Sequence, residues 1–288
     1  MWALVTGASS GIGRDMSRYL YNLGYNLIIV ARNKNGLEEL KKDLETTKSN
    51  NEIERNNNQK EDRINNEIIE NRKIKDRTIS KSKQEIIVIP KDLSQKENCL
   101  ELYQETKHIT LDLLVNNAGF GVFGEFIETD LETEINLINT NIMAVHILTK
   151  LYLKDMVKQN KGHILNVASI AGMEPGPLMA AYYASKSYVI RLSRAINKEI
   201  KKKKLNVKIS ILCPGPVDTN FNNVAKVVFK TPSMTSEKVA KYGIDKALKG
   251  KLIIIPGILN KSVRFFSKII PDCILESVAY HIQRRKRI

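Results

Sequence analysis

Cysteine is scarce in this sequence, and long hydrophobic runs are missing from it. The three cysteines, Cys99, Cys213 and Cys273, are odd in number and far apart, which does not fit a disulfide framework or a cysteine metal site. We therefore expect free or buried thiols in a reducing compartment, and no bound metal. No apolar run approaches the roughly 18 residues that a membrane-spanning helix needs. The chain opens on the strand-like segment 1–6 rather than on a signal peptide, which predicts a cytoplasmic protein.

Acidic residues are also few, because 31 Asp and Glu stand against 46 Lys and Arg, for a net charge of +15. The basic clusters Lys201–Lys204 and Arg284–Arg287 have no aromatic residues among them, and no nucleic-acid-binding motif is present. We therefore expect no nucleic-acid partner. A phosphate-rich cofactor or an anionic membrane surface fits this charge better. With 288 residues, 42% of them hydrophobic, the chain is long enough for one large α/β domain.

A glycine-rich turn follows the first strand-like run, Trp2–Thr6, and the amphipathic segment 14–23 after the turn predicts a helix. In this strand–turn–helix context a glycine motif indicates dinucleotide binding. Gly7 permits the sharp turn, Gly11 lets a pyrophosphate approach the backbone, and Gly13 lets the helix pack on the strand. The free N–H groups and the dipole of the helix N-terminus would then stabilise the phosphates.

The predicted second strand, residues 26–31, ends at Arg32, where a protein that binds the ribose 2′-hydroxyl of NAD carries an acidic residue. A guanidinium hydrogen-bonds a 2′-phosphate through two N–H groups, whereas a carboxylate would repel it. Arg14 would add to the positive field. The alternative is a solvated arginine at a strand end. In the context of the glycine turn, Arg32 predicts a preference for NADP over NAD.

Ser169, Tyr182 and Lys186 form the candidate catalytic set. Tyr182 and Lys186 are four residues apart, so on a helix they lie on one face. An ammonium beside the phenol predicts a lowered pKa for Tyr182, which would make it a general acid–base. Ser169 ends a predicted strand, where it is placed to hold the oxygen that the phenol protonates. Ketone–alcohol interconversion needs these groups beside a hydride donor. Taken alone, a Tyr and a Lys four residues apart are also common on the exposed surface of helices.

These motifs occur in the order and at the spacing of a known family. The glycine turn after Thr6, the segment Asn116-Asn117-Ala118-Gly119, and the pair Tyr182 and Lys186 resemble the short-chain dehydrogenase/reductase family over residues 1 to about 260. The resemblance implies a single-domain, doubly wound α/β fold of Rossmann type with a seven-stranded, mostly parallel sheet. It also implies a homodimer or homotetramer. We expect strands over 2–6, 26–31, 85–92, 111–116, 162–169, 206–213 and 251–257.

The resemblance also assigns roles to single residues. Asn141 would hold a water that links Lys186 to solvent, so the implied catalytic residues are Asn141, Ser169, Tyr182 and Lys186. Asp92 would contact the adenine amino group; without the family, it is equally a helix N-cap. The implied cofactor-binding residues are Gly7, Ser9, Ser10, Gly11, Ile12, Gly13, Arg32, Asp92, Leu93, Asn117, Ala118, Gly119, Tyr182, Lys186, Pro214, Gly215, Val217 and Thr219.

Three segments depart from a plain reductase domain over 1–260. Residues 47–83 are rich in Asn and charge and lack aromatic residues, Gly and Pro, which predicts a disordered or weakly helical insertion without an assigned function. Residues 220–234 have no strong period and would form a substrate lid. The tail 261–288 carries apolar residues at helical spacing and a basic end. Its apolar face either packs on the lid or a second subunit, or lies on an anionic membrane.

The combined pattern predicts an NADP(H)-dependent oxidoreductase that interconverts a ketone or aldehyde and an alcohol. The lid segment offers apolar residues and no evident carboxylate clamp, so an apolar ketone or a 3-oxoacyl chain fits better than a small acid. A different class of function is a non-catalytic NADP-binding sensor on the same fold. The complete set of catalytic side chains argues against the sensor. The apolar residues of the predicted lid are Phe221, Val224, Val227 and Phe229.

Overall fold

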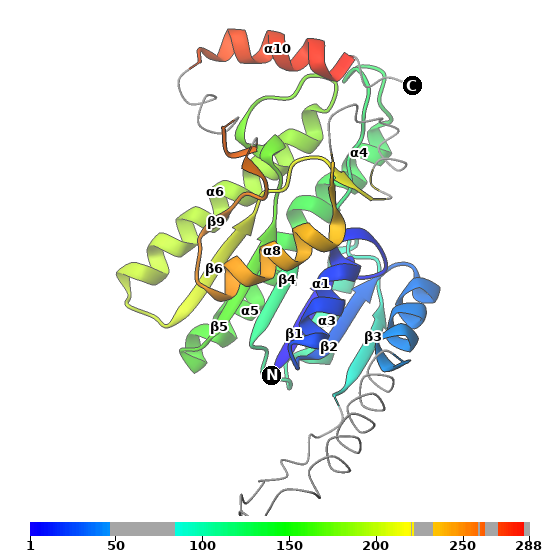
Figure 1. Ribbon diagram of the computed structural model, residues 1–288, viewed down its shortest axis with the longest axis vertical. Helices are drawn as coiled ribbons and strands as arrows, with labels where there is room; N and C mark the ends of the chain where they lie inside the picture. Colours follow the sequence, from blue (N-terminus) through cyan, green and yellow to red (C-terminus); the bar gives the residue numbers. More distant parts are fainter. Residues whose placement is uncertain (47–83, 220, 222–232, 259, 263–269, 285–288) are drawn as a thin grey trace, which may run out of the picture.

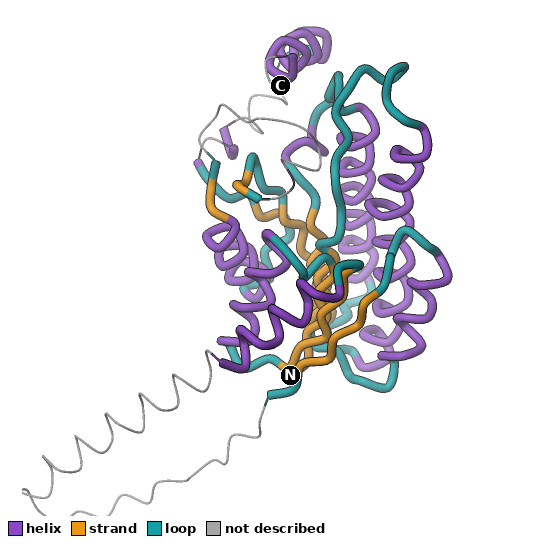
Figure 2. Tube along the Cα trace, turned by 90° about the vertical axis from the view of Figure 1, so that its right-hand side faces the viewer, coloured by secondary structure: helices purple, strands orange, loops and turns teal. Residues whose placement is uncertain are grey.

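The computed structural model describes residues 1–46, 84–219, 221, 233–258, 260–262 and 270–284. The predicted insertion at 47–83 and most of the predicted lid lie outside the described residues. The described part is an α/β fold in which a central sheet lies between two layers of helices (Figure 1, Figure 2).

Seven strands form one sheet in the order β3-β2-β1-β4-β5-β6-β9, and every neighbouring pair is parallel. The predicted fold class is therefore confirmed. The strand order reverses between β1 and β4, which is where ligands bind in open parallel sheets. Helices cover both faces, so the strands consist largely of buried Val, Ile and Leu. The strands are β1 (Trp2–Thr6), β2 (Asn26–Ala31), β3 (Ile86–Pro90), β4 (Leu113–Asn116), β5 (Gly162–Val167), β6 (Val207–Leu212) and β9 (Ile253–Ile254).

The helices divide between the two faces. On one face α1, α8 and a helix over 34–46 pack on the sheet, and on the other α3, α5 and α6 do so. A small second sheet pairs β7 (Val217–Asp218) with β8 (Met234–Thr235). The other elements are α1 (Gly11–Asn22), α3 (Lys96–Thr106), α4 (Leu131–Ile138), η1 (Asn139–Ala144), α5 (Val145–Gln159), η2 (Ile170–Met173), α6 (Ala180–Lys202), α8 (Ser236–Leu248) and α10 (Asp272–Arg284).

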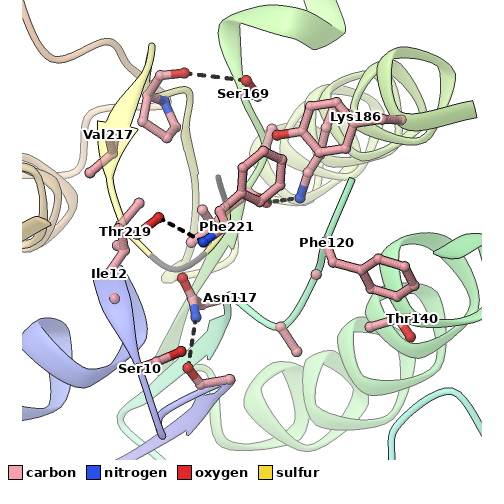
Figure 3. A pocket seen from close by; sticks show the side chains of 18 of the residues that line it. Ser10, Ile12, Asn117, Phe120, Thr140, Ser169, Lys186, Val217, Thr219 and Phe221 are labelled. Atoms are coloured by element: carbon pink, nitrogen blue, oxygen red, sulfur yellow. Dashed lines mark hydrogen bonds between the residues drawn. The ribbon is translucent and has the colours of Figure 1, made fainter. Parts of the chain in front are cut away.

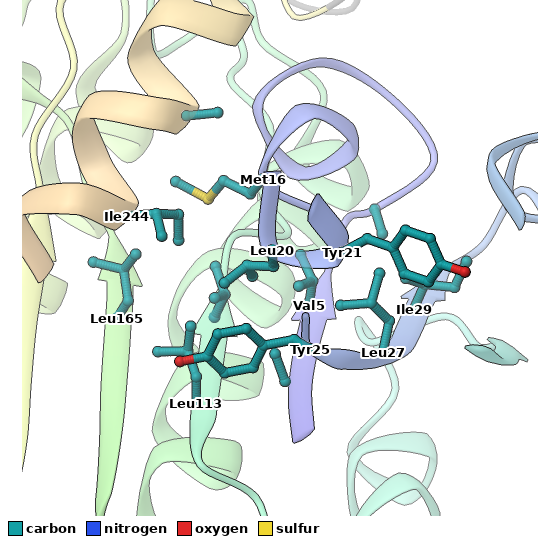
Figure 4. Packing of buried hydrophobic residues seen from close by; sticks show 14 of the residues in the cluster. Val5, Met16, Leu20, Tyr21, Tyr25, Leu27, Ile29, Leu113, Leu165 and Ile244 are labelled. Atoms are coloured by element: carbon teal, nitrogen blue, oxygen red, sulfur yellow. The ribbon is translucent and has the colours of Figure 1, made fainter. Parts of the chain in front are cut away.

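Alternation along the strands builds the two cores. In β1, Val5 points to the layer of α1 and α8, whereas Leu4 points to the opposite layer. On the α1 side Met16 and Leu20 meet Ile244 of α8, and Figure 4 shows these side chains gathered over the strands. The buried side chains fix the sheet register and thereby the positions of the strand ends.

The helical stretch over 131–159 is irregular at Asn141. Helix α4 passes through the π-helical turn η1 into α5, and Asn141 lies within that turn, fully buried. Its amide is occupied by the backbone of Phe120, with bonds of 3.1 Å and 2.9 Å, and by the hydroxyl of Ser185 at 3.0 Å. π-helical turns of this kind are frequent at functional sites.

Helix α10 lies at the end of the molecule toward which the strands of the sheet run (Figure 1). Its Ile274, Val278 and Ile282 are each about half exposed, at 51%, 49% and 50%. These three side chains recur every fourth residue and therefore lie on one face of the helix. Among the described helices, none is long and apolar enough to cross a lipid bilayer.

Candidate active site

A cavity of about 420 Å³ opens at the carboxyl ends of the central strands (Figure 3). Of the residues predicted to form the site, all but Gly13 and Asn141 line this cavity. Gly13 lies beneath the glycine turn, and Asn141 lies behind the cavity wall. Motifs that are far apart in the sequence are therefore brought to one space, because parallel strands deliver their carboxyl ends to the same edge of the sheet.

The glycine turn has the shape that a dinucleotide needs. Gly7 and Gly11 have φ values of +68° and +53°, which side chains other than hydrogen rarely allow. A Cβ on Gly13 would lie 2.3 Å from the carbonyl oxygen of Gly7. Asn117 closes the turn from below, since its Nδ2 donates to the carbonyls of Thr6 at 3.0 Å and Gly7 at 3.3 Å. The turn thus leaves its backbone bare on the cavity side, which fits a pyrophosphate.

The two asparagines of the Asn-Asn-Ala-Gly segment differ in function. Asn116 is buried and donates to Thr149 at 3.1 Å and to Asn166 of β5 at 2.8 Å, so it ties neighbouring elements together. Asn117 joins the end of β4 to the end of β1 and lines the cavity. The two amides therefore connect adjacent strands of the sheet.

At the opposite end of the glycine turn, Arg32 and Asp92 face each other. The Nη1 atom of Arg32 lies 4.0 Å from Oδ2 of Asp92, and both side chains are well exposed, at 59% and 38%. Asp92 also accepts a hydrogen bond from the backbone of Ser94 at 3.0 Å. The N-cap of α3 is Gln95, so Asp92 does not cap that helix. Both residues and the neighbouring Leu93 line the cavity, as predicted.

Ser169, Tyr182 and Lys186 meet at the other end of the cavity. Ser169 follows β5, and its hydroxyl donates to the carbonyl of Pro214 at 3.3 Å and accepts from the backbone of Ala171 at 3.1 Å. Lys186 is buried on α6, and its Nζ lies 5.8 Å from the centre of the Tyr182 ring. The same Nζ donates to the carbonyl of Val167 at 3.1 Å. The predicted shared face of Tyr182 and Lys186 is therefore present.

The expected lowering of the Tyr182 pKa is wrong for this structure. Burial raises the pKa of Tyr182 to about 12, and a hydrogen bond with Ser169 opposes that shift only in part. Burial likewise lowers the pKa of Lys186 to about 8, with Cys213 opposing the shift. The physical reason is that removal from water disfavours the charged form of each group, the phenolate of Tyr182 and the ammonium of Lys186. The phenol is therefore held in its proton-donating form.

Gly119 separates Asn141 from the cavity. A Cβ on Gly119 would lie 2.8 Å from Oδ1 of Asn141 and 3.3 Å from Nζ of Lys186. The amide and the amine therefore lie against the same bare stretch of backbone, and only glycine leaves them this room.

The turn after β6 forms the wall between the two ends of the cavity. Pro214, Gly215 and Val217 line it, and Val217 is fixed by the pairing of β7 with Met234 of β8. Thr219 contacts the glycine turn, because a Cβ on Gly11 would lie 3.1 Å from its Cγ2. The predicted residues of this turn are thus assembled beside the glycines.

Sequence reasoning missed part of the apolar end of the cavity. Met179 is buried there and packs with Phe123, Tyr182, Tyr183 and Phe221. Phe221 was predicted as a lid residue, and the predicted lid residues Val224, Val227 and Phe229 lie outside the described residues. No motif marks the other lining residues, because single apolar residues carry no signal of a site. The lining residues missed by sequence reasoning include Phe120, Thr140, Ile170, Met179 and Tyr183.

Comparison with known proteins identifies the family. The short chain dehydrogenase family matches residues 1–68 and 65–227. The chain belongs to the short-chain dehydrogenase family. It is 30% identical over 244 residues to very-long-chain 3-oxoacyl-CoA reductase-B of Danio rerio, which covers 83% of this chain and 66% of that protein. The chain thus spans slightly less than two thirds of that relative's length.

Solved structures of short-chain dehydrogenases share the fold. A short-chain dehydrogenase from Sphingobium yanoikuyae in complex with NADPH matches with a TM-score of 0.73 at 21% identity, over 94% of this chain and 96% of that chain. A short-chain dehydrogenase/reductase from Burkholderia phymatum in complex with NAD also gives 0.73, at 20% identity, over 91% of each chain. The predicted family and fold are confirmed.

Proposed function

We propose that this chain is an NADP(H)-dependent oxidoreductase that interconverts a ketone or aldehyde and an alcohol. The observation that carries the proposal is one continuous cavity with the glycine turn at one end and Ser169, Tyr182 and Lys186 at the other. A dinucleotide cradle and a proton donor for a carbonyl oxygen thus open into the same space. Membership of a family of oxidoreductases supports the same reaction class.

The side chains divide the proton chemistry among them. When bound, NADPH supplies a hydride to the carbonyl carbon. Tyr182 donates its phenol proton to the carbonyl oxygen, and Ser169 orients that oxygen. The raised pKa of Tyr182 keeps the phenol protonated at neutral pH, which suits reduction. Lys186 would bind the ribose hydroxyls and stabilise the phenolate that remains. Asn141 would hold a water that links Lys186 to solvent.

The preference for NADP rests on Arg32. Its guanidinium lies at the cavity end where a 2′-phosphate would be placed, and the position carries no carboxylate of its own. Asp92 faces Arg32 and offsets part of its charge, but an exposed pair is easily rearranged by a doubly charged phosphate.

The substrate class rests on the apolar end of the cavity. Phe120, Met179 and Phe221 line it, and beside the catalytic set the polar side chains there are the uncharged Thr140 and Tyr183. An apolar ketone or a 3-oxoacyl chain is therefore the proposed substrate. The likeness to a very-long-chain 3-oxoacyl-CoA reductase supports this class.

Steady-state oxidation of NADPH against a panel of apolar ketones, aldehydes and 3-oxo esters tests the proposal, with NADH run in parallel. We expect at least one carbonyl to be reduced, faster with NADPH than with NADH, and no turnover by Tyr182→Phe. If no carbonyl is reduced while NADPH binds tightly, the chain is instead a non-catalytic sensor. The complete catalytic set in one cavity speaks against that alternative.

The tail helix supports a second, separate proposal: the protein is cytoplasmic and binds anionic lipid surfaces through α10. Ile274, Val278 and Ile282 form a half-exposed apolar face, and His281 and Arg284 lie beside it. The sequence then continues with three more basic residues. Such a helix lies flat at a lipid surface, with its apolar face in the acyl region and its cations on the headgroups.

Sedimentation with liposomes tests the lipid proposal. We expect binding to vesicles that contain phosphatidylserine and little binding to neutral phosphatidylcholine vesicles. Changing Ile274, Val278 and Ile282 together to Ser should abolish binding, whereas Leu248→Ser on α8, another exposed apolar position, should not. Equal binding to both vesicle types would contradict the lipid proposal. Sedimentation velocity of the same wild-type sample tests the separate expectation of a homodimer or homotetramer.

A further inference from the structure

A second phenol lies beside the catalytic one. Tyr183 follows Tyr182 on α6, yet both line the cavity, although neighbouring residues on a helix normally point in different directions. Their ring centres are 6.2 Å apart and the rings are nearly perpendicular, at 75°. Tyr183 therefore places a second phenol in the wall of the cavity, and the proposed reaction does not use it.

The ring and the hydroxyl of Tyr183 are both held in place. The ring lies against the backbone of Gly176, where a Cβ would come within 2.2 Å of it. The hydroxyl accepts a hydrogen bond from Nε2 of Gln283, which comes from α10, one hundred residues further along the chain. Gln283 is only 2% exposed, on the side of α10 away from the apolar face of Ile274 and Val278. The tail helix thus fixes a side chain of the cavity.

The direction of this hydrogen bond decides what Tyr183 can still do. A phenol has one proton to donate and lone pairs to accept. The amide of Gln283 uses a lone pair and leaves the proton of Tyr183 available. Burial raises the pKa of Tyr183, with Tyr182 and Glu174 adding to the effect, so the hydroxyl keeps that proton at neutral pH. Tyr183 can consequently donate one further hydrogen bond.

The amide of Gln283 is held there at a cost. Within the described part of the chain its Oε1 is buried and has no hydrogen-bond partner. An unpaired buried acceptor destabilises the folded state, because it has lost its hydrogen bond to water. A fold selected for stability alone would carry an apolar side chain at this position, so the cost indicates that the orientation of Tyr183 serves the cavity.

We propose that Tyr183 is a substrate-binding hydrogen-bond donor that selects carbonyl compounds with a second acceptor oxygen close to the reacting carbonyl, such as 3-oxo esters and 3-oxo thioesters. This inference rests on the proposed function. Tyr182 protonates the oxygen of the reacting carbonyl, and Tyr183 holds the ester or thioester oxygen. Gln283 is a positioning residue, because it acts only through Tyr183.

Two matched substrates test the proposal. One is a 3-oxo ester, and the other is a ketone of equal length in which a methylene group replaces the ester carbonyl. An ester also activates the ketone chemically, so the informative quantity is how the ratio of the two kcat/KM values changes between variants. Tyr183→Phe removes only the hydroxyl. Gln283→Glu keeps the contact, but an ionised carboxylate can only accept a hydrogen bond. Tyr183 would then donate its hydrogen bond to that carboxylate instead of to the substrate. Tyr280→Phe removes a phenol hydroxyl of α10 that does not line the cavity.

We expect the ester-to-ketone ratio to fall about tenfold in Tyr183→Phe and in Gln283→Glu, the size of one lost hydrogen bond, and to stay constant in Tyr280→Phe. NADPH affinity and the thermal midpoint establish that each variant is folded. An unchanged ratio in Tyr183→Phe, or an equal fall in the control, overturns this inference. A wild-type protein that reduces neither substrate overturns the proposed function itself, and the two failures are therefore distinguishable.

Discussion

The guanidinium of Arg32 lies 4.0 Å from the carboxylate of Asp92 across the adenosine end of the cavity. Under the proposed function, one residue of this pair would attract a 2′-phosphate and the other would repel it, so we expect the pair to set the preference between NADP and NAD as a balance. Both side chains are well exposed, which keeps their mutual attraction weak and leaves Arg32 available to a more highly charged partner.

The balance predicts opposite effects of two variants. Arg32→Ala should weaken NADPH binding about tenfold and leave NADH binding nearly constant, because only NADPH has the 2′-phosphate that Arg32 is proposed to bind. Asp92→Asn should tighten NADPH binding, because it removes a negative charge that repels the phosphate and keeps a side chain of the same size. Fluorescence titration measures both affinities. Equal losses for NADPH and NADH in Arg32→Ala would show that the arginine serves the fold and not the phosphate.

Removal of the phenol hydroxyl of Tyr182 should abolish reduction. General acid catalysis by a positioned group contributes about 10²–10⁴-fold, so kcat of Tyr182→Phe should fall by at least that lower factor. NADPH binding should stay nearly intact, since most of the cofactor-facing surface comes from other elements. Rapid-mixing measurement of NADPH oxidation separates the two quantities. Retained turnover in this variant would contradict the catalytic assignment of Tyr182.

Reduction should weaken at alkaline pH because of Lys186. Burial lowers the pKa of Lys186 to about 8, so its ammonium is present below that pH and is lost as the pH rises through it. The lysine stabilises the phenolate only while charged. We therefore expect kcat/KM for ketone reduction to fall as the pH rises through about 8.

Lys186→Arg provides the matched test, because a guanidinium stays charged throughout this range. Its absolute activity is of secondary interest, since an arginine is larger than the lysine. Its pH profile should lose the fall near pH 8, whatever its maximum. A wild-type profile that is flat from pH 7 to 9 would be incompatible with the titration of Lys186.

Motifs in the sequence predicted most of the residues that line the glycine-turn end of the cavity and few of those that line its apolar end. Gly7, Asn117 and Tyr182 have backbone or chemical requirements that only a few residue types meet, so their spacing carries information. Met179 and Phe120 are ordinary apolar residues, and only the tertiary fold makes them part of a cavity. Gln283 reaches Tyr183 across one hundred residues, which no local pattern records.

The sequence pattern also predicted the positions of the catalytic side chains more reliably than their pKa values. Tyr182 and Lys186 lie on one helix face because four residues make about one turn. Their pKa values depend instead on how much water the surrounding elements exclude, and that burial reverses the expected shift of Tyr182. Asn141 is an intermediate case: the resemblance to the family marked the residue, but its π-helical turn and its partner Ser185 are visible only in the fold.

A buried histidine in the sheet predicts acid sensitivity. His163 of β5 is 6% exposed and shares a 2.9 Å hydrogen bond with Ser210 of β6, whose hydroxyl donates to the carbonyl of Lys251 at 2.7 Å. Burial, aided by the charge of Lys208, lowers the pKa of His163 to about 4. Because the unfolded chain has a pKa near 6.5, it binds the proton more readily than the folded chain does.

The folded state therefore gains stability from neutral His163 that is fully present above about pH 6.5 and is lost as the pH falls toward about 4. A shift of this size corresponds to about 3 kcal/mol in the free energy of unfolding. Urea denaturation at a series of pH values should show this slope in the wild type and a shallower slope in His163→Gln. His108→Gln, at an exposed position, serves as the control and should keep the wild-type slope. Identical slopes in wild type and His163→Gln would assign the acid sensitivity to other groups.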